Sequence, residues 1–147
     1  VFFSCKNEKE IIQEVAYNYA FAMGNYLVED AEQYATPETK ETTLEKAKYL
    51  VKAVGPEYIS KDTPANLEIT SLDITSDTTA VACYHKTTPL KDFTGEMHLV
   101  KRNGTWLVHD PLIVTKQKKQ DTLKNKIFPK HLFDSIKTAN EKNTKKQ

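Results

Sequence analysis

Glycine, cysteine and long apolar stretches are all scarce in this 147-residue chain, and each scarcity disfavours a class of protein. With only four Gly, the chain has no phosphate-binding loop and no dinucleotide fingerprint, which argues against standard nucleotide enzymes. With only two Cys, it has neither a disulfide framework nor zinc-knuckle spacing. No apolar run approaches the roughly 20 residues of a membrane-spanning helix. The length and the 39% hydrophobic content fit one folded domain.

The net charge of +1 hides an uneven distribution along the chain. Residues 1–115 hold 11 Lys or Arg against 17 Asp or Glu, whereas residues 116–147 hold 10 against 3. The sequence therefore predicts an acidic domain followed by a basic C-terminal extension, 116–147, with a short helix from Pro129 and a disordered end from Asn140. Because the extension lacks Arg and interleaved aromatic residues, nucleic-acid binding is disfavoured.

The first residues, Val1-Phe2-Phe3-Ser4-Cys5, resemble a bacterial lipobox, in which an apolar export signal ends in a small residue before a lipid-bearing Cys. The polar run from Lys6 to Glu10 follows at once, as expected for a tether. We therefore predict that residues 1–9 are a signal remnant and lipid-anchor tether with Cys5 as the lipidated residue. The alternative is a frayed apolar end that carries an incidental Cys.

Three helices are predicted in the N-terminal half. Apolar residues recur every three or four positions from Ile11 to Leu27, which indicates one long amphipathic helix. A shorter helix is expected over Val28 to Ala35. In the third helix, Thr36 is expected to cap the first turn and Pro37 to occupy the first helical position; Gly55-Pro56 ends it.

After Pro64 the apolar period changes to two, which predicts strands near 67–74, 79–86, 93–102 and 105–110. Leu67 and Leu72 fall on different faces of a regular strand, so a bulge is expected near Thr70-Ser71. Asn103-Gly104 is typical of a two-residue type I′ turn. That turn sets Arg102 opposite Thr105, Leu99 opposite Val108 and His98 opposite His109. The face that bears Leu99 and Trp106 is predicted to cover the first helix at Val15, Tyr19 and Met23.

Two segments carry a resemblance to a known family: YATPETKETT in the helical half and EMHLVKRNGTWLV in the last hairpin. The chain over about 8–113 resembles small bacterial envelope lipoproteins of unknown function with a nuclear-transport-factor-2-like, or cystatin-superfamily, domain. The resemblance implies an α+β fold in which N-terminal helices pack in the concave face of a curved antiparallel sheet, here over 10–115. Both motifs are structural, so they indicate a fold better than an activity.

Few residues indicate chemistry. The cone of such a fold can host isomerases and dehydratases, and Tyr17, Tyr19, Asp73 and Asp110 are the candidate cavity residues. Asp110, beside Pro111, is also explained as a strand-end residue that binds a nearby amide. His98 and His109, with Cys83, His85 and Glu96 on the same face, are weak metal candidates; a polar, solvent-side sheet face with ordinary half-exposed His residues is the favoured explanation. Cys83 is expected to be a small buried residue.

These observations predict a non-enzymatic domain that is lipid-anchored in the bacterial cell envelope and faces the periplasm or the cell exterior. Its expected ligand is a small apolar molecule or an envelope protein, bound at the open end of the cone, and a homodimer through the sheet is a further expectation. No cofactor and no metal are expected. The alternative is a cavity enzyme of the isomerase or dehydratase type with an Asp or His base.

Overall fold

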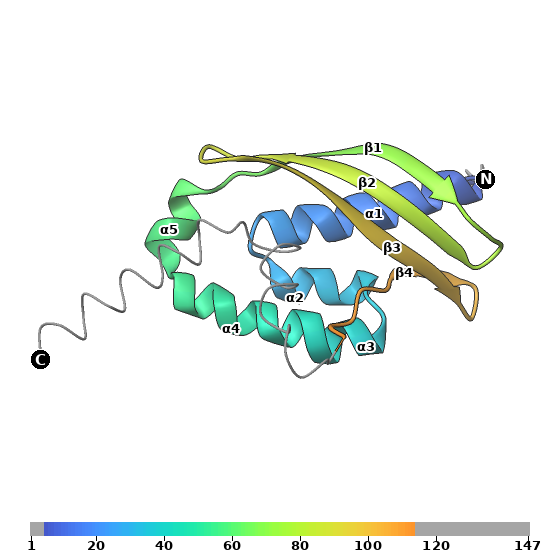
Figure 1. Cartoon of the computed structure of the whole chain (residues 1–147), viewed down its shortest axis with the longest axis horizontal. Coiled ribbons are helices and arrows are strands. Elements are labelled where there is room, and N and C mark those ends of the chain that lie inside the picture. The colour runs from blue at the N-terminus through green and yellow to red at the C-terminus, as the bar shows by residue number, and fades with distance from the viewer. Residues whose placement is uncertain (1–4, 114–147) are drawn as a thin grey trace, which may run out of the picture.

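The computed structural model describes residues 5–113 as helices packed on one face of a curved sheet (Figure 1). The strands are β1 (Asn66–Ile74), β2 (Thr79–Thr87), β3 (Asp92–Arg102) and β4 (Thr105–Val108). They pair antiparallel in the order β1-β2-β3-β4. The predicted α+β class and the meander of four strands are therefore confirmed.

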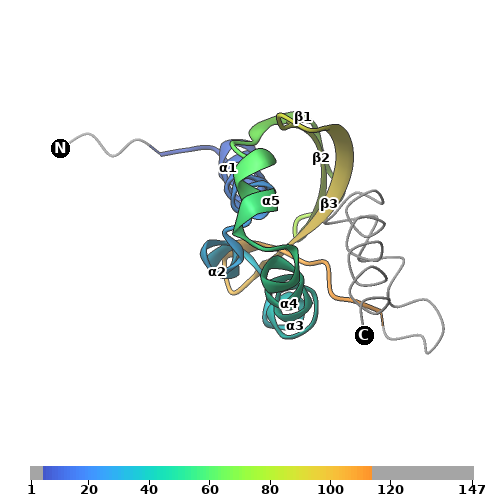
Figure 2. The same ribbon diagram turned by 90° about the vertical axis from the view of Figure 1, so that its left-hand side faces the viewer.

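The long first helix, α1 (Glu8–Gly24), lies across the concave face of the sheet (Figure 2). Its N-cap is Asn7, whose side chain accepts a hydrogen bond from the amide of Glu10. The helix begins two residues before the predicted domain boundary at residue 10. Only Cys5, Lys6 and Asn7 of the predicted tether therefore precede it among the described residues.

The remaining helical segments form a second, shorter layer beside α1. The segment predicted as one helix over 28–35 is instead α2 (Val28–Ala31) followed by the 3-10 turn η1 (Glu32–Tyr34). The predicted third helix is continuous but mixed, with α3 (Pro37–Thr39), a π-helical turn η2 (Lys40–Leu44) and α4 (Glu45–Val54). Sequence reasoning missed α5 (Pro56–Lys61), because a Gly-Pro pair ends one helix and Pro also starts the next.

The predicted helix start at Thr36 is confirmed. Its side chain caps α3 by accepting from the amide of Thr39, and Pro37 occupies the first turn. The backbone amide of Thr36 donates to the carbonyl of Val108 at 3.0 Å. The helical layer is thus joined to the end of β4 by a direct backbone hydrogen bond.

The strand register follows the sequence prediction closely. The β1–β2 pairing shifts between Ile69 and Ser71, which confirms the bulge. Across the Asn103-Gly104 turn, Arg102 pairs with Thr105 and Leu99 with Val108. Both turn residues have positive φ, 51° and 78°, as a type I′ turn requires. The fourth strand ends at Val108, earlier than predicted, and residues 112–113 form no strand.

The core lies between α1 and the concave face of the sheet. Tyr19, Leu99 and Trp106 are buried as predicted, whereas Val15 and Met23 are half-buried and pack against the core. Within residues 5–113, no helix combines the length and the apolar character that crossing a membrane requires.

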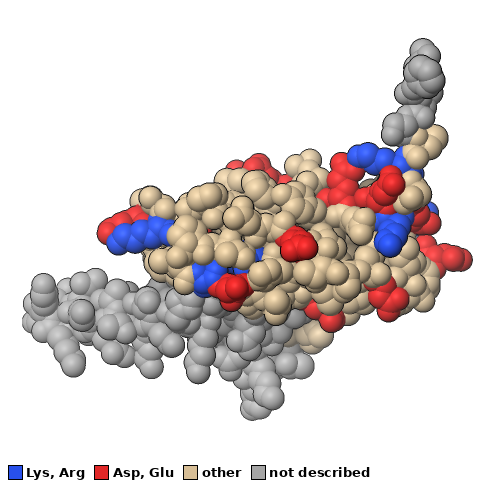
Figure 3. Space-filling model, turned by 90° about the horizontal axis from the view of Figure 1, so that it is seen from above, with Lys and Arg blue, Asp and Glu red and all other residues tan. Residues whose placement is uncertain are grey.

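The outer face of the sheet is more polar. Cys83 lies there half-buried, opposite Glu96, and is not the buried residue that was predicted. Seen from above the sheet, much of the surface is uncharged, and charged side chains gather near the N-terminal end of α1 (Figure 3). The predictions for Val1–Ser4 and for residues 116–147 fall outside the described residues.

Candidate functional site

A small cavity opens between the C-terminal half of α1 and strands β2 and β3. Its volume is about 40 Å³, which is room for roughly three water molecules. We call it the mouth cavity; its lining residues are Tyr19, Ala20, Met23, Gly24, Tyr84, Lys86, Glu96, Met97 and Asp110.

Lys86 is the one cation among residues 5–113 that lines the mouth cavity, and it is only 6% exposed. Among residues 5–113, no side chain or backbone group forms a hydrogen bond or ion pair with its amine; the Nζ atom instead lies 5.6 Å from the ring centroid of Phe93. Burial, with a smaller contribution from the like charge of Lys91, lowers the pKa of Lys86 to about 8. The mouth cavity thus holds a desolvated amine with no fixed counter-ion.

Two phenols and a carboxyl group share the cavity with Lys86. Burial, together with the nearby charge of Asp110, raises the pKa of Tyr84 to about 12 and raises that of Tyr19 further. Both phenols therefore stay protonated at neutral pH. Their O–H groups are suited to donate hydrogen bonds and not to act as bases.

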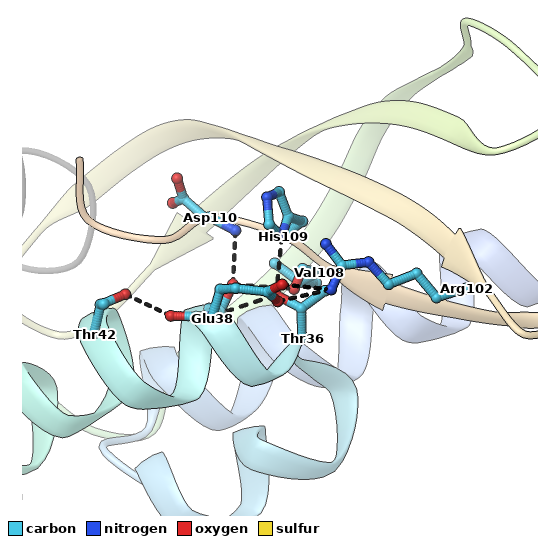
Figure 4. A network of polar contacts seen from close by, with 8 residues as sticks. Thr36, Glu38, Thr42, Arg102, Val108, His109 and Asp110 are labelled. Atoms are coloured by element: carbon cyan, nitrogen blue, oxygen red, sulfur yellow. Dashed lines mark hydrogen bonds and ion pairs between the residues drawn. The ribbon is translucent and has the colours of Figure 1, made fainter.

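Asp110 is held in place through its backbone (Figure 4). Its amide donates to Thr39 Oγ1 at 2.9 Å, and its carbonyl accepts from Thr43 Oγ1 at 2.5 Å. The carboxylate points away from these helix contacts. A polar network of the helices thus fixes the backbone of Asp110, two residues after the end of β4, and Asp110 also lines the mouth cavity.

The same network includes His109 and Arg102. Thr36 Oγ1 and His109 Nδ1 are hydrogen-bonded at 3.0 Å. Arg102 Nη1 contacts both carboxylate oxygens of Glu38, at 2.9 and 2.7 Å, and this pairing lowers the pKa of Glu38. His109 therefore serves in the interface between helix and sheet and does not line the mouth cavity.

Two glycines allow the close packing around the mouth cavity. A Cβ on Gly24 would lie 3.1 Å from Lys86 Cδ, so the lysine stem passes directly over α1. A Cβ on Gly95 would lie 2.5 Å from the ring of Tyr84, so this ring rests on bare backbone of β3. Gly24 and Gly95 therefore fix where the amine and the phenol lie.

A buried polar cluster is centred on Asp62, at the C-terminal end of α5. Asp62 is fully buried and accepts hydrogen bonds from Tyr26 and Thr88, each at 2.5 Å, while Lys91 Nζ lies 2.6 Å from its Oδ2 atom. Burial alone would raise the pKa of Asp62, but these three partners outweigh it and hold the pKa below its usual value. The cluster ties the loop after β2 to the end of α5.

A wider and more open groove of about 260 Å³ lies between α2 and α4. Lys48, one of its charged lining residues, already forms ion pairs with Glu32 and Glu45. Val28 and Val51 supply apolar lining, and Leu27, also in the lining, is 45% exposed. The groove has a larger volume than the mouth cavity but no buried unpaired charge.

The other candidates from the sequence lie apart from one another. Tyr17 does not line the mouth cavity; it is 40% exposed and stacks on Phe21 on the outward side of α1, because it is two residues out of phase with Tyr19. Asp73 is exposed on β1. Cys5 is exposed just before α1.

The metal candidates are distributed in pairs. His85 contacts Asp92, and His98 Nε2 lies 3.4 Å from Glu96 Oε1. Within residues 5–113, no group of three His, Cys, Asp or Glu side chains is placed to hold a metal ion. These residues thus share the outer face of the sheet, but their side chains do not point toward a common metal position.

No protein-family model and no curated protein matches the sequence. Solved structures do match. One is the crystal structure of a Campylobacter jejuni protein described as a "Putative NTF2-like transpeptidase", with a TM-score of 0.52 and 14% identity, over 71% of this chain and 99% of the other. The chain has an NTF2-like fold. At 14% identity, the likeness concerns the fold alone.

Of the residues that line the mouth cavity of this NTF2-like domain, sequence reasoning found Tyr19 and Asp110 but missed Lys86. The signal was present, because Lys86 continues the alternation of Ala80, Ala82 and Tyr84 on the concave face of β2. A charged residue on an otherwise apolar, inward face is rarely buried without a function or a partner. The partners of Asp62 come from two distant segments, the end of α1 and the loop between β2 and β3, so no local pattern predicts them.

Proposed function

We propose that this NTF2-like domain is a binding module that takes a small ligand, or one side chain of a partner protein, at the mouth cavity. The observation that carries the proposal is the buried amine of Lys86 beside an apolar lining that includes Met23 and Met97. A buried charge without a fixed partner is costly, and a ligand with a polar head on a short apolar body would supply the missing partner.

The size of the cavity supports binding over catalysis. About 40 Å³ accommodates a head group or a molecule of a few heavy atoms, far below the roughly 300 Å³ at which pockets for larger ligands begin. The alternative, an isomerase or dehydratase, is supported only by the presence of Asp110, Tyr19 and Tyr84 in one cavity. Neither His109 nor His98 lines it, so Asp110 would be the base.

We expect butyrate, a carboxylate on a short apolar chain, to shift the backbone amide resonances of Gly24, Tyr84 and Met97 in an NMR titration. Lys86→Met keeps the length of the side chain but removes the charge, so it should weaken butyrate binding at least 10-fold. Lys52 is exposed on α4, so Lys52→Met is the matched control and should leave the affinity for butyrate unchanged.

Two outcomes would change the assignment. Absence of any shift at the mouth residues in millimolar butyrate would overturn the binding proposal. Shifts that disappear in Asp110→Asn but persist in Lys86→Met would favour the alternative, a site organised around a carboxylate base.

We also propose that the domain is anchored in the bacterial cell envelope through lipid on Cys5. The sequence pattern before Cys5 supports this, and the thiol is exposed just outside the folded body. Two or three acyl chains on one N-terminal Cys hold a domain at a bilayer, whereas one chain gives only marginal binding. The domain would then face the periplasm or the cell exterior.

Cys5→Ser should release the protein from the membrane. The gene is expressed in a bacterium with its native upstream sequence, and the protein is followed by detergent partitioning and intact mass. The unchanged protein should enter the detergent phase with added lipid mass, and Cys83→Ser, the matched control, should behave in the same way. Wild-type protein that stays soluble, unmodified and still attached to Val1–Ser4 would refute the anchor and leave the binding proposal untouched.

A further inference from the structure

The amine of Lys86 has the surroundings of a nucleophile more than those of a structural cation. Its stem lies against Gly24, its Nζ lies near the ring of Phe93, and its side chain is 6% exposed. Its neighbours on the concave face of β2 are Ala82 and Tyr84. A lysine held in this way is desolvated and has little freedom to reach bulk water.

The charges around Lys86 do not supply it with a counter-ion. The two charged groups with a resolved influence on it are Lys91, which has the same sign, and Asp62, which already binds Lys91 together with Tyr26 and Thr88. Burial and Lys91 both favour the neutral amine. Desolvation and a neighbouring cation are the two features that activate lysines as nucleophiles.

The other titratable residues in the lining of the mouth cavity are Tyr19, Tyr84, Glu96 and Asp110, and the carboxylate of Glu96 lies beside His98 on the outer face of the sheet. The phenols are proton donors because their pKa values are raised by burial. A carbonyl oxygen is a pure acceptor, so it matches a cavity that offers O–H groups beside an amine. The apolar lining, Ala20, Met23 and Met97, suits a short alkyl chain.

We propose that Lys86 captures small aliphatic aldehydes or ketones as a reversible imine at the mouth cavity. This rests on the proposed function, because the ligand reaches Lys86 through the same opening. The Nζ lone pair forms a bond to the carbonyl carbon while the C=O π pair moves to oxygen, which takes up a proton. The carbinolamine then loses this oxygen as water and leaves C=N, so that amine and carbonyl give imine and water without any redox change.

The experiment uses the folded chain with propanal as the probe and cyanoborohydride as the trap, at pH 8. Hydride from cyanoborohydride reduces C=N to a stable secondary amine, and peptide mass spectrometry locates the propyl group. We expect Lys86 to be labelled at least 10-fold faster than exposed Lys52. At pH 8 about half of the Lys86 amine is unprotonated, since its pKa is about 8, whereas an ordinary lysine has a pKa of about 10.4.

In urea, Lys86 should lose its advantage over Lys52, because unfolding removes the cavity that desolvates its amine. Lys86→Arg keeps the positive charge and should remove only the label at position 86.

Labelling of Lys86 at the rate of Lys52, in protein that still binds butyrate at the mouth, would overturn the imine and leave the binding proposal intact. Failure of both measurements would overturn both. Fast labelling of Lys86 that persists in urea would also overturn the inference, because the reactivity would then not depend on the folded cavity.

Discussion

Replacing Asp62 with alanine should lower the free energy of unfolding by about 3–5 kcal/mol, because it leaves a buried cation without its counter-ion. The Lys91 side chain is 6% exposed and would lose the carboxylate that lies 2.6 Å from its amine. The hydroxyls of Tyr26 and Thr88 would lose their acceptor as well. Urea denaturation followed by circular dichroism measures the change.

Two further variants separate the charge from the packing. Asp62→Leu combined with Lys91→Met removes both charges, and should recover most of the loss because a buried ion pair replaced by apolar groups is often neutral. Thr88→Val should cost less, about 1–3 kcal/mol, since it removes the hydrogen bond to Asp62 and the acceptor of the Leu90 and Lys91 amides but leaves the ion pair in place. A loss below 1 kcal/mol for Asp62→Ala would show that the cluster does not stabilise the fold.

The same cluster should make stability depend on pH. Because the folded-state pKa of Asp62 is lowered, its contribution is fully present above the unfolded-state pKa of about 3.9 and is lost as the pH falls through the lower folded value. The difference in unfolding free energy between the wild type and Asp62→Asn, which cannot ionise, should therefore shrink below about pH 4 and be constant above about pH 5.

Trp106→Ala should cost about 3–5 kcal/mol of stability, because the indole is 3% exposed in the centre of the contact between α1 and β4. Truncation leaves a cavity that the surrounding helix and sheet cannot close without moving. Thermal and urea unfolding should both report the loss. Tyr49→Ala, at a side chain that is 68% exposed on α4, is the matched aromatic control and should stay within about 0.5 kcal/mol of the wild type.

The hydrogen bond of Trp106 contributes separately from its burial. Its Nε1 atom donates to Glu8 Oε1 at 3.0 Å, and Lys101 Nζ lies 3.0 Å from the same oxygen. These contacts lower the pKa of Glu8, but the carboxylate is exposed to solvent. Glu8→Gln should therefore cost much less than Trp106→Ala. Equal losses for the two variants would contradict the burial explanation.

Local chemistry accounts for the parts of the fold that the sequence predicted. A two-residue turn at Asn103-Gly104 admits one register, and Thr36-Pro37 admits one helix start, so both could be identified without knowing the rest of the chain. The end of β4 was placed too late because its pairing stops where Asp110 begins to bind the helices, and such tertiary bonds leave no periodic signal.

The candidate site was harder to predict for the same reason. Tyr19 could be identified from the buried stripe of α1, but Tyr17 could be excluded only once the helix had been placed against the sheet. The environment of Lys86 depends on Gly24 at the end of α1, and on Phe93 and Lys91 at the start of β3 and in the loop before it. A pattern along one strand shows that a lysine points inward but not what it meets there.

The helix α1 runs between Cys5, the proposed anchor, and the mouth cavity. The helix has 17 residues, so at 1.5 Å per residue its ends lie about 25 Å apart. Glu8 is fixed to the hairpin at one end, and Gly24 borders the mouth cavity at the other. An anchored domain would therefore open toward the surrounding fluid, several Debye lengths of about 8 Å from the lipid headgroups. Ligand capture there should be insensitive to the surface charge of the bilayer.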